Sequence, residues 1–309
     1  MQLKKKQRSN YGSRMTRKWL GMCLIPLLFV VVFSYIPMFG TIIAFKDYRY
    51  DLGILGSEWV GFKNFEFFFK SDTFLRITYN TLKYNILFII VGTVCAVGLA
   101  LLLYGITSRR KTKIFQTILI TPHFMSWVVV ASMAYAILKP GNGFLNVILG
   151  WFGVEPINWY GETGAWTPIL TISYLWKTVG MDAIIYYAAL MGIDNSYIEA
   201  ARVDGANNRQ ITWKIIIPFL VALITTLTVL KVGNIFRADF GLFYQVPRNI
   251  GTLFETTDVV DTYIYRSMKE IGDMGMSTAI GLLQSVVGFV LVVITNKISK
   301  KIDPNSGLF

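Results

Sequence analysis

Six stretches of the chain consist almost entirely of apolar residues, with polar residues gathered between them. They cover roughly residues 19–45, 85–104, 115–138, 167–190, 214–235 and 278–296. A helix needs about 20 residues to cross the roughly 30 Å hydrocarbon core of a bilayer. None of the runs shows the alternating pattern of a strand in a membrane barrel. Outside a barrel, a segment in lipid can satisfy its own backbone hydrogen bonds only as a helix. The pattern therefore predicts an all-α, polytopic membrane protein with six transmembrane helices.

The composition agrees with a membrane protein. Of the 309 residues, 54% are hydrophobic and 16% are charged, whereas about a quarter of a soluble domain is charged. The first apolar run is longer than the core of a signal peptide, and no small-residue cleavage site follows it. We expect one six-span membrane domain over residues 19–296, between a basic tail of residues 1–18 and a C-terminal tail of residues 297–309.

The net charge of +12 is distributed unevenly between the predicted loops. The two tails and the loops after the second and fourth spans hold seventeen Lys and Arg against four acidic residues. The loops of about 46–78, 139–166 and 236–277 hold ten against thirteen. Basic residues accumulate on the cytoplasmic side of membrane helices. Both termini are therefore predicted to be cytoplasmic, and we expect no nucleic-acid partner.

The sequence lacks the motifs of several catalytic and energy-coupling sites. It contains no G-x-x-x-x-G-K-[ST], no H-E-x-x-H and no G-x-S-x-G. Cys23, Cys95 and the single His123 do not have the spacing of a metal site or a disulfide framework. We expect no catalytic residue, no metal and no cofactor in this chain. Six helices without a hydropathy repeat are also few for a secondary transporter, so the energy for transport would come from another chain.

A polar stretch, "YIEAARVDGANNRQITWKIIIPFL", interrupts the apolar pattern between the fourth and fifth spans. Ser196 and Glu199 have the spacing of a capping box, which predicts the start of a short helix. Asp204-Gly205 predicts a turn, because glycine readily adopts positive φ. Asn207 and Gln210 predict a second cap, and Pro218 is expected near the start of the next helix or at a kink. The residues alone leave open a docking element or an ordinary loop.

Three parts of this stretch resemble the EAA loop in the membrane subunits of bacterial ABC importers. They are Glu199-Ala200-Ala201, Asp204-Gly205-Ala206 and Ile216-Ile217-Pro218. The spacing and the position between the fourth and fifth spans both agree. "TPHFMSWVVVASMAYAIL" (121–138), the stretch 261–292 and the terminal "GLF" resemble carbohydrate-uptake permeases, in particular the branch for complex oligosaccharides and polysaccharide fragments. The resemblance covers about residues 20–309.

The resemblance implies a type I ABC importer transmembrane domain and a permease subunit of an ATP-driven sugar importer, with an oligosaccharide as the expected substrate. Residues 193–213 would form the coupling loop, which docks in a cleft of the cytoplasmic ATPase. Glu199 would bind an ATPase arginine, Gly205 would allow the sharp turn, and Arg202 and Asp204 would lie at the rim of the contact. The implied coupling residues are Glu199, Ala200, Ala201, Arg202, Asp204, Gly205 and Ala206.

The resemblance also implies the partners. They are a paralogous permease, an ATPase dimer that uses ATP and Mg²⁺, and a solute-binding protein on the outer face of a bacterial cell membrane. The alternative is an ion-coupled secondary carrier or channel subunit, which would work without an ATPase and leaves the EAA pattern unexplained.

Polar residues inside the spans are candidates for a translocation path. Lys177 lies in mid-span, where a charge is costly unless it faces protein or water. Asp182 is about 140° further round the helix, so the two need not pair. Lys231 is able to extend its ammonium group outward. The path candidates are Trp176, Lys177, Asp182, Tyr186 and Asn234. Interhelix bonding is the other interpretation of these residues, and packing is the other interpretation of the aromatic residues in loop 236–277.

Overall fold

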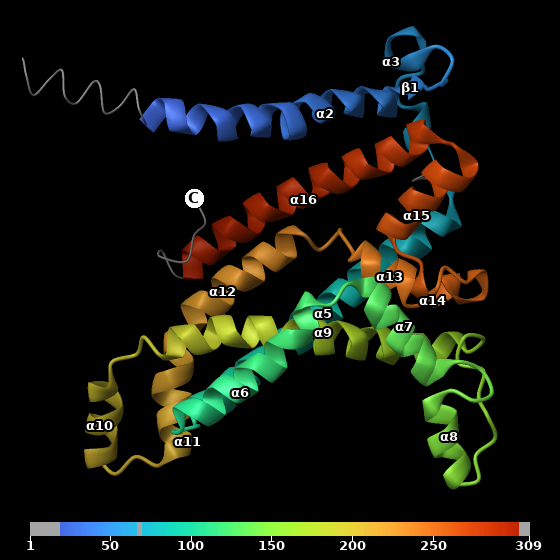
Figure 1. Cartoon of the computed structure of the whole chain (residues 1–309). Helices are drawn as coiled ribbons and strands as arrows, with labels where there is room; N and C mark the ends of the chain where they lie inside the picture. Colours follow the sequence, from blue (N-terminus) through green and yellow to red (C-terminus); the bar gives the residue numbers. More distant parts are fainter. Residues whose placement is uncertain (1–18, 67–69, 303–309) are drawn as a thin grey trace, which may run out of the picture. The chain divides into compact units, whose positions relative to one another are not determined.

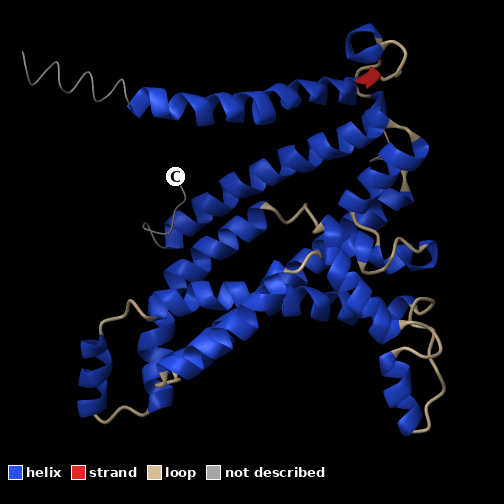
Figure 2. Ribbon diagram, in the orientation of Figure 1, coloured by secondary structure: helices blue, strands red, loops and turns tan. Residues whose placement is uncertain are grey.

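The computed structural model describes residues 19–66 and 70–302, so the predicted basic tail of residues 1–18 lies outside the described part. Helices dominate this part (Figure 2). The chain divides into two compact units, Met1–Glu66 with Gly272–Leu282 and Phe67–Ile271 with Leu283–Phe309. The membrane domain predicted over residues 19–296 thus contains parts of both units.

The described part of the first unit contains a helix over Trp19–Phe45 whose side chains are almost all exposed. A π turn, η1 (Val31–Tyr35), precedes α2 (Ile36–Met38), and the 3₁₀ helix η2 (Phe39–Phe45) ends it. Pro37 explains the π turn, because proline has no N–H and its ring crowds the carbonyl one turn back. Such an exposed apolar helix fits contact with lipid or with another membrane subunit.

A small loop structure follows this helix. It contains β1 (Lys46–Asp47), α3 (Gly53–Gly56), β2 (Glu58–Trp59) and η3 (Lys63–Phe65), and the two strands pair antiparallel. The buried Lys46 donates hydrogen bonds to the carbonyl oxygens of Ile54 at 2.7 Å, Leu55 at 3.2 Å and Ser57 at 3.1 Å. These bonds satisfy carbonyls at the end of α3, so a polar network stabilises the loop in place of a large core.

The second unit consists of helices and their connecting loops in its described residues. Its first half contains α5 (Asp72–Tyr104), α6 (Arg109–Ile120), η4 (Thr121–Phe124), α7 (Trp127–Leu138), α8 (Phe144–Trp151), η5 (Thr163–Ala165) and α9 (Trp166–Leu190). Its second half contains α10 (Asn195–Val203), α11 (Asn208–Ile211), η6 (Thr212–Ile216), α12 (Ile217–Gly233), α13 (Phe240–Gln245), η7 (Gly251–Leu253), α14 (Phe254–Thr257), α15 (Val260–Arg266) and η8 (Ser267–Ile271). The last helix, α16 (Met274–Ile302), starts in the first unit and ends in the second.

The described residues contain four helices that are long and apolar enough to cross a membrane: Trp19–Phe45, Asp72–Tyr104, Asn208–Gly233 and Met274–Lys301. They correspond to four of the six predicted spans. A bent pair, Arg109–Phe124 with Trp127–Leu138, makes a fifth if it is one span. The segment predicted at 167–190 is the 25-residue α9, which is not in this group.

The prediction of one helix over residues 115–138 is wrong, because the chain bends by 97° between η4 and α7. Pro122 lies in the 3₁₀ turn η4, and Met125 and Ser126 have extended backbone conformations. The Ser126 hydroxyl then accepts a hydrogen bond from the Val129 N–H at 3.4 Å and caps the new helix. Proline and an N-cap residue in succession end one helix and start another.

Helix α9 is the centre of the second unit and packs along α5 (Figure 1). Trp166, Leu170, Ala183, Tyr186 and Leu190 are fully buried along its length. A side chain at Gly180 would overlap the backbone carbonyl of Leu119, so glycine lets α9 and α6 cross closely. A helix packed against protein on several sides can carry charged residues, which explains why α9 tolerates Lys177 and Asp182.

Candidate functional site

The predicted coupling loop forms a short helix, a turn and a second helix. The first helix, α10, begins at Asn195, and its cap is Asp194, which accepts a hydrogen bond from the Ser196 N–H at 2.9 Å. The predicted capping box of Ser196 and Glu199 is therefore wrong. This hydrogen bond lowers the pKa of the Asp194 carboxyl, so the cap is ionised at neutral pH and favours the positive end of the helix dipole.

The predicted turn at Gly205 is confirmed. Gly205 has a φ of +80°, its N–H bonds to the Arg202 carbonyl at 3.1 Å, and the Ala206 N–H bonds to the Ala201 carbonyl at 2.9 Å. These two bonds form a Schellman motif, which ends a helix with a residue in the left-handed region. A Cβ at this position would meet no atom within 4 Å, so space does not require glycine here. The positive φ requires it, because other residues rarely adopt this conformation.

The second predicted cap is also confirmed. Asn207 accepts a hydrogen bond from the Gln210 N–H at 2.9 Å, and the Gln210 side chain accepts one from the Asn207 N–H at 2.8 Å. The helix continues from α11 through the π turn η6 into α12. Pro218 lies in the first turn of α12, directly after this π turn. The structure therefore accommodates Pro218 in the same way as Pro37.

One apolar face holds the coupling loop against the membrane helices. Ile198, Ile211 and Ile216 are buried in a cluster with Ala100, Leu190 and other residues of α5, α9 and α12. Ala201 and Ala206 are half-buried beside them. The opposite face of α10 exposes Tyr197, Ala200, Val203 and Asp204, and Val203 is 89% exposed. Sequence reasoning missed Val203, although its spacing from Ala200 places both on one face of the helix.

Glu199 and Arg202 line a cleft of about 530 Å³ between α10 and the end of α5. Leu101, Tyr104 and Thr107 line it from the α5 side, and Asn195, Ile198 and Asn208 from the coupling loop. Glu199 is exposed and has no hydrogen bond or ion pair with any described residue. The cleft thus presents an unpaired carboxylate next to an arginine on a rigid helix.

Two of the candidate path residues take part in contacts between helices. Asp182 of α9 pairs with Lys231 of α12 at 2.7 Å, so Lys231 does not extend away from the protein. Lys177 donates to the carbonyl oxygen of His123 at 2.8 Å and lies over the Trp127 ring. That carbonyl lies in the bend between α6 and α7, where the regular helical bonds end. Lys177 and Asp182 thus have different partners and do not pair with each other.

The other three candidates lie in different environments. Trp176 is partly exposed on α9, and Tyr186 is fully buried in the core of this chain. The Asn234 side chain is exposed and bonds to the Leu230 carbonyl at 3.1 Å in its own helix. Of the five candidates, Lys177 and Asp182 are those whose side chains form a hydrogen bond or ion pair shorter than 3 Å with another element of the described structure.

A buried ion pair in the segment 236–277 was missed by sequence reasoning. Arg266 donates to Asp258 at 2.6 Å, and Thr262 donates to the same carboxylate at 2.8 Å. Asn80 of α5 donates to the Asp258 carbonyl at 3.0 Å and so fastens this segment to the membrane helix. Nearby, burial raises the pKa of the Asp261 carboxyl, although it accepts hydrogen bonds from the Ala238 N–H and from Gln284. The described residues contain no group of three His, Cys, Asp or Glu arranged to hold a metal ion.

Comparison with protein families gives one match over most of the chain. Residues 89–304 match the family described as "Binding-protein-dependent transport system inner membrane component". The polygalacturonan/rhamnogalacturonan transport system permease protein YteP of Bacillus subtilis (strain 168) is 35% identical over 92% of this chain and 88% of its own length. Protein LplB of the same organism is 35% identical over 94% of this chain and 91% of its own length.

Two solved structures share this fold. The first is a bacterial ABC transporter involved in the import of the acidic polysaccharide alginate, with a TM-score of 0.86 and 33% identity over 95% of this chain and 99% of that chain. The second is a bacterial alginate ABC transporter in complex with an alginate pentasaccharide-bound periplasmic protein, with a TM-score of 0.84 and 33% identity over 94% of this chain and 97% of that chain.

Proposed function

Because this chain belongs to the family of binding-protein-dependent transport system inner membrane components, we propose that it forms, together with a second permease, a path that carries an oligosaccharide across the membrane. The chain has the type I transmembrane fold of ABC importers and is a non-catalytic permease subunit. YteP and the alginate transporter are both named for the movement of polysaccharides or their fragments, which supports an oligosaccharide as the substrate.

The observation that carries the coupling mechanism is the rigid construction of α10. It has a side-chain cap at its start, a Schellman turn at its end and a buried contact through Ile198. A push on such an element moves the core cluster with it, because packed interiors resist compression. We propose that α10 docks in a cleft of an ATPase subunit and passes the movement of that subunit to α5, α9 and α12.

Glu199 is the proposed centre of this contact. Its carboxylate lines the cleft without a partner in the described residues, so it is available to an arginine of the ATPase. A charge-assisted pair in a site that closes on docking is stronger than an exposed one. Ala200 and Val203 lie on the face of α10 that points away from the buried Ile198, and they provide an apolar area for the ATPase. Arg202 and Asp204 are proposed to lie at the edge of this contact.

The nucleotide belongs to the partner in this proposal. This chain would bind no cofactor, and ATP with Mg²⁺ would be bound and hydrolysed by the ATPase dimer. Both termini and the coupling loop would lie on the cytoplasmic side of a bacterial cell membrane, as the distribution of Lys and Arg predicts. A solute-binding protein would deliver the sugar to the opposite face.

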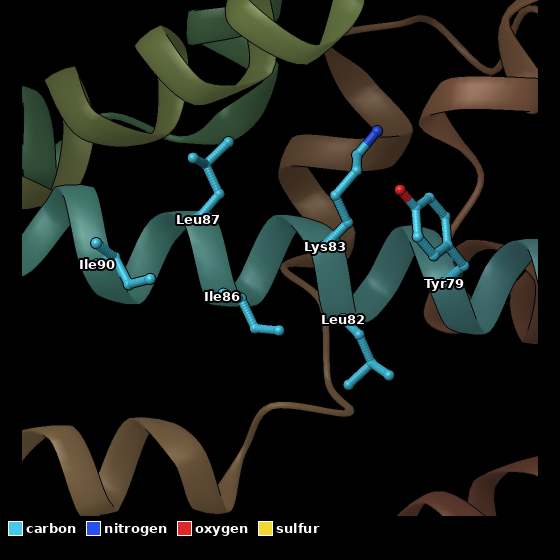
Figure 3. Close-up of a pocket in the computed structure, with 6 residues that line it drawn as sticks. All are labelled: Tyr79, Leu82, Lys83, Ile86, Leu87 and Ile90. Carbon is cyan, nitrogen blue, oxygen red and sulfur yellow. The ribbon is translucent and has the colours of Figure 1, made fainter.

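The exposed side of α5 is a suitable surface for the second permease. Tyr79, Leu82, Lys83, Ile86, Leu87 and Ile90 line a groove of about 450 Å³ along successive turns of this helix (Figure 3). Tyr79 and Ile90 are mostly exposed. A groove between large apolar side chains allows the side chains of a partner helix to pack into it. Close van der Waals packing of this kind is what drives helices to associate in lipid.

The path itself is proposed to run beside α9. Trp176, Lys177 and Asp182 of this helix, with Asn234, supply the polar and aromatic groups that a sugar requires, whereas the predicted path residue Tyr186 is buried in the core and does not line the path in this conformation. The pair of Asp182 with Lys231 neutralises two charges between helices, and we propose that it maintains the separation of α9 and α12 during transport. Loss of one partner leaves an uncompensated charge, which is costly at this depth.

The test of the coupling contact uses cells that carry this chain with its partners. Glu199→Gln keeps the size of the side chain and removes its charge. We expect at least a tenfold loss of ATP-dependent oligosaccharide uptake and weak retention of the ATPase during purification, with normal abundance in the membrane. The matched control is Glu155→Gln, which changes another exposed glutamate outside the coupling loop.

Uptake and ATPase retention should be unchanged in the Glu155→Gln control. If Glu199→Gln also retains both, the carboxylate has no role at the ATPase contact and the proposed coupling site is wrong. If Glu199→Gln retains the ATPase but loses uptake, the residue acts in transmission of the movement and not in docking. That outcome contradicts the proposed ion pair.

A further inference from the structure

A polar pocket of about 310 Å³ lies between α7 and the turn that follows α13. It is lined by Val128, Ala131, Ser132, Tyr244, Gln245, Arg248 and Asn249. Arg248 is the one charged residue of this lining. Ligand sites begin at about 300 Å³, so the space suits a single sugar unit of a longer chain.

The guanidinium group of Arg248 is held in place but not neutralised. It lies over the Tyr135 ring, 4.2 Å from the ring centre, and its side chain has no hydrogen bond or ion pair with any described residue. Arg266, the neighbouring arginine, is by contrast paired with Asp258 and bonds to Asn249. A stacked arginine retains all its N–H donors, and their planar fork matches the two oxygen atoms of a carboxylate.

The backbone of the turn that carries Arg248 is strained. Arg248 has a φ of +60° and Asn249 a φ of +51°. Two successive non-glycine residues in the left-handed region are uncommon, and each costs free energy that the surrounding structure must offset. The buried Val246 and Pro247 before them hold the turn in place. Strain of this kind is concentrated at binding sites, where it fixes a side chain in advance.

The remaining lining suits a sugar. The Tyr244 ring stacks on Phe240 at 4.9 Å and contacts the edge of Tyr265 at 5.1 Å, so its position is fixed by aromatic neighbours. Such a ring offers a platform for the C–H face of a pyranose. The Ser132 hydroxyl and the Gln245 amide lie in the same lining and provide hydrogen-bonding groups for sugar hydroxyls.

We propose that this pocket is a subsite for a sugar unit that carries a carboxylate, that is, a uronate. Arg248 binds the carboxylate through two parallel hydrogen bonds, Tyr244 contacts the ring, and Ser132 and Gln245 bind hydroxyl groups. This inference rests on the proposed function and narrows its substrate class from oligosaccharides to acidic oligosaccharides.

The experiment measures binding to the purified complex of this chain with its second permease and ATPase. The probes are a galacturonate trisaccharide and the same trisaccharide with its carboxyl groups reduced to alcohols. The test variant is Arg248→Asn, because asparagine tolerates the left-handed backbone of this turn. Arg248→Lys tests the bidentate geometry, and Arg237→Gln removes an exposed arginine that is not in the pocket lining.

We expect the unmodified complex to bind the acidic probe about tenfold more tightly than the reduced probe. Arg248→Asn should abolish this preference, Arg248→Lys should restore it in part, and Arg237→Gln should leave it unchanged. A preference that persists in Arg248→Asn overturns the subsite, and so does equal or absent binding of the two probes by the unmodified complex.

The outcome can be separated from that of the proposed function. ATP hydrolysis by the same complex, stimulated by its loaded solute-binding protein, reports coupling without reference to the pocket. Intact stimulation with no preference at Arg248 overturns the uronate subsite alone. Thermal unfolding of each variant shows that it is folded, and Tyr244→Leu provides a second change in the lining that leaves the turn intact. Tyr244→Leu should weaken both probes equally, and an unchanged affinity for both contradicts the assigned contact.

Discussion

Helices α8 and α10 end in the same way but are fastened to the protein differently. Gly153 closes α8 with a φ of +76°, and its N–H and that of Val154 bond to the carbonyls of Gly150 and Leu149. Gly205 closes α10 with the corresponding pair of bonds. The two helices lie toward opposite ends of α9 (Figure 1). The same local device therefore occurs in the predicted coupling loop and in a loop toward the other end of α9.

The difference lies in the anchors. In α8, the buried Asn146 side chain donates to the Ile157 carbonyl and accepts from the Ile157 N–H and from Trp159, at 2.9 to 3.2 Å. In α10, the anchor is the apolar side chain of Ile198, and polar groups face outward or into the cleft. A fully satisfied polar network fixes one position of a loop. An apolar anchor holds a helix in place and leaves its polar side chains available to a partner. We infer that α8 is a fixed element and α10 a docking element.

The largest expected effect is on the anchors. Asn146→Ala removes three hydrogen bonds and leaves buried partners unsatisfied, which costs about 2–4 kcal/mol of folding free energy. Ile198→Ala leaves a cavity and costs about the same. Both should lower the unfolding temperature of the purified complex, but only Ile198→Ala should reduce uptake per folded molecule. Equal uptake by the two variants would contradict the division into a fixed and a docking helix.

The next effect separates the two glycine turns. Gly205→Val and Gly153→Val each place a β-branched residue in the left-handed region, at a cost of about 1–2 kcal/mol. Uptake, corrected for the amount in the membrane, should be lost in Gly205→Val and retained in Gly153→Val. Gly205→Asn should retain most activity, because asparagine tolerates this conformation. Equal loss from both valine variants would indicate a general folding defect.

A smaller change in stability is expected at the exposed faces. Val203→Asp and Val147→Asp both alter exposed valines of the two helices, so folding free energy should change by about 0.5 kcal/mol or less. Val203→Asp should nevertheless release the ATPase during purification, because it places a charge in the proposed contact. Val147→Asp is the matched control and should retain the ATPase. Retention by both variants would exclude Val203 from the interface.

The smallest effect concerns the start of each helix. The pKa of Asp194 is lowered from 3.8 by its bond to the Ser196 N–H, so its ionised form stabilises α10. This contribution is present above about pH 3.8 and is lost as the pH falls through the lower folded-state value. The first turn of α8 follows Gly143, which offers no side-chain cap. Hydrogen exchange, corrected for intrinsic rates, should show loosening of residues 195–199 in acid, and Asp194→Asn should remove this pH dependence.

Local spacing predicted the parts of the coupling loop that depend on neighbouring residues. The cap of Asn207 and Gln210 and the turn at Gly205 both follow from bonds within a few residues. The first cap was predicted at the wrong residue, because Asp194 and Ser196 are both good caps. The choice depends on the direction in which the chain leaves α9, which local spacing does not contain. Pro37 and Pro218 each follow a π turn, which local residue spacing does not predict.

The sequence by itself determined the helical class, most of the membrane segments and the turn and second cap of the predicted coupling loop, because hydrophobic length and short-range caps act along the chain. Tertiary structure alone decided the pairing of Asp182 with Lys231 and the stacking of Arg248 on Tyr135. The partners in each of these pairs are at least 49 residues apart, and the carbonyl of His123, which Lys177 binds at the bend before α7, is 54 residues from Lys177. Such contacts depend on which helix faces meet, and that is settled only when the helices pack.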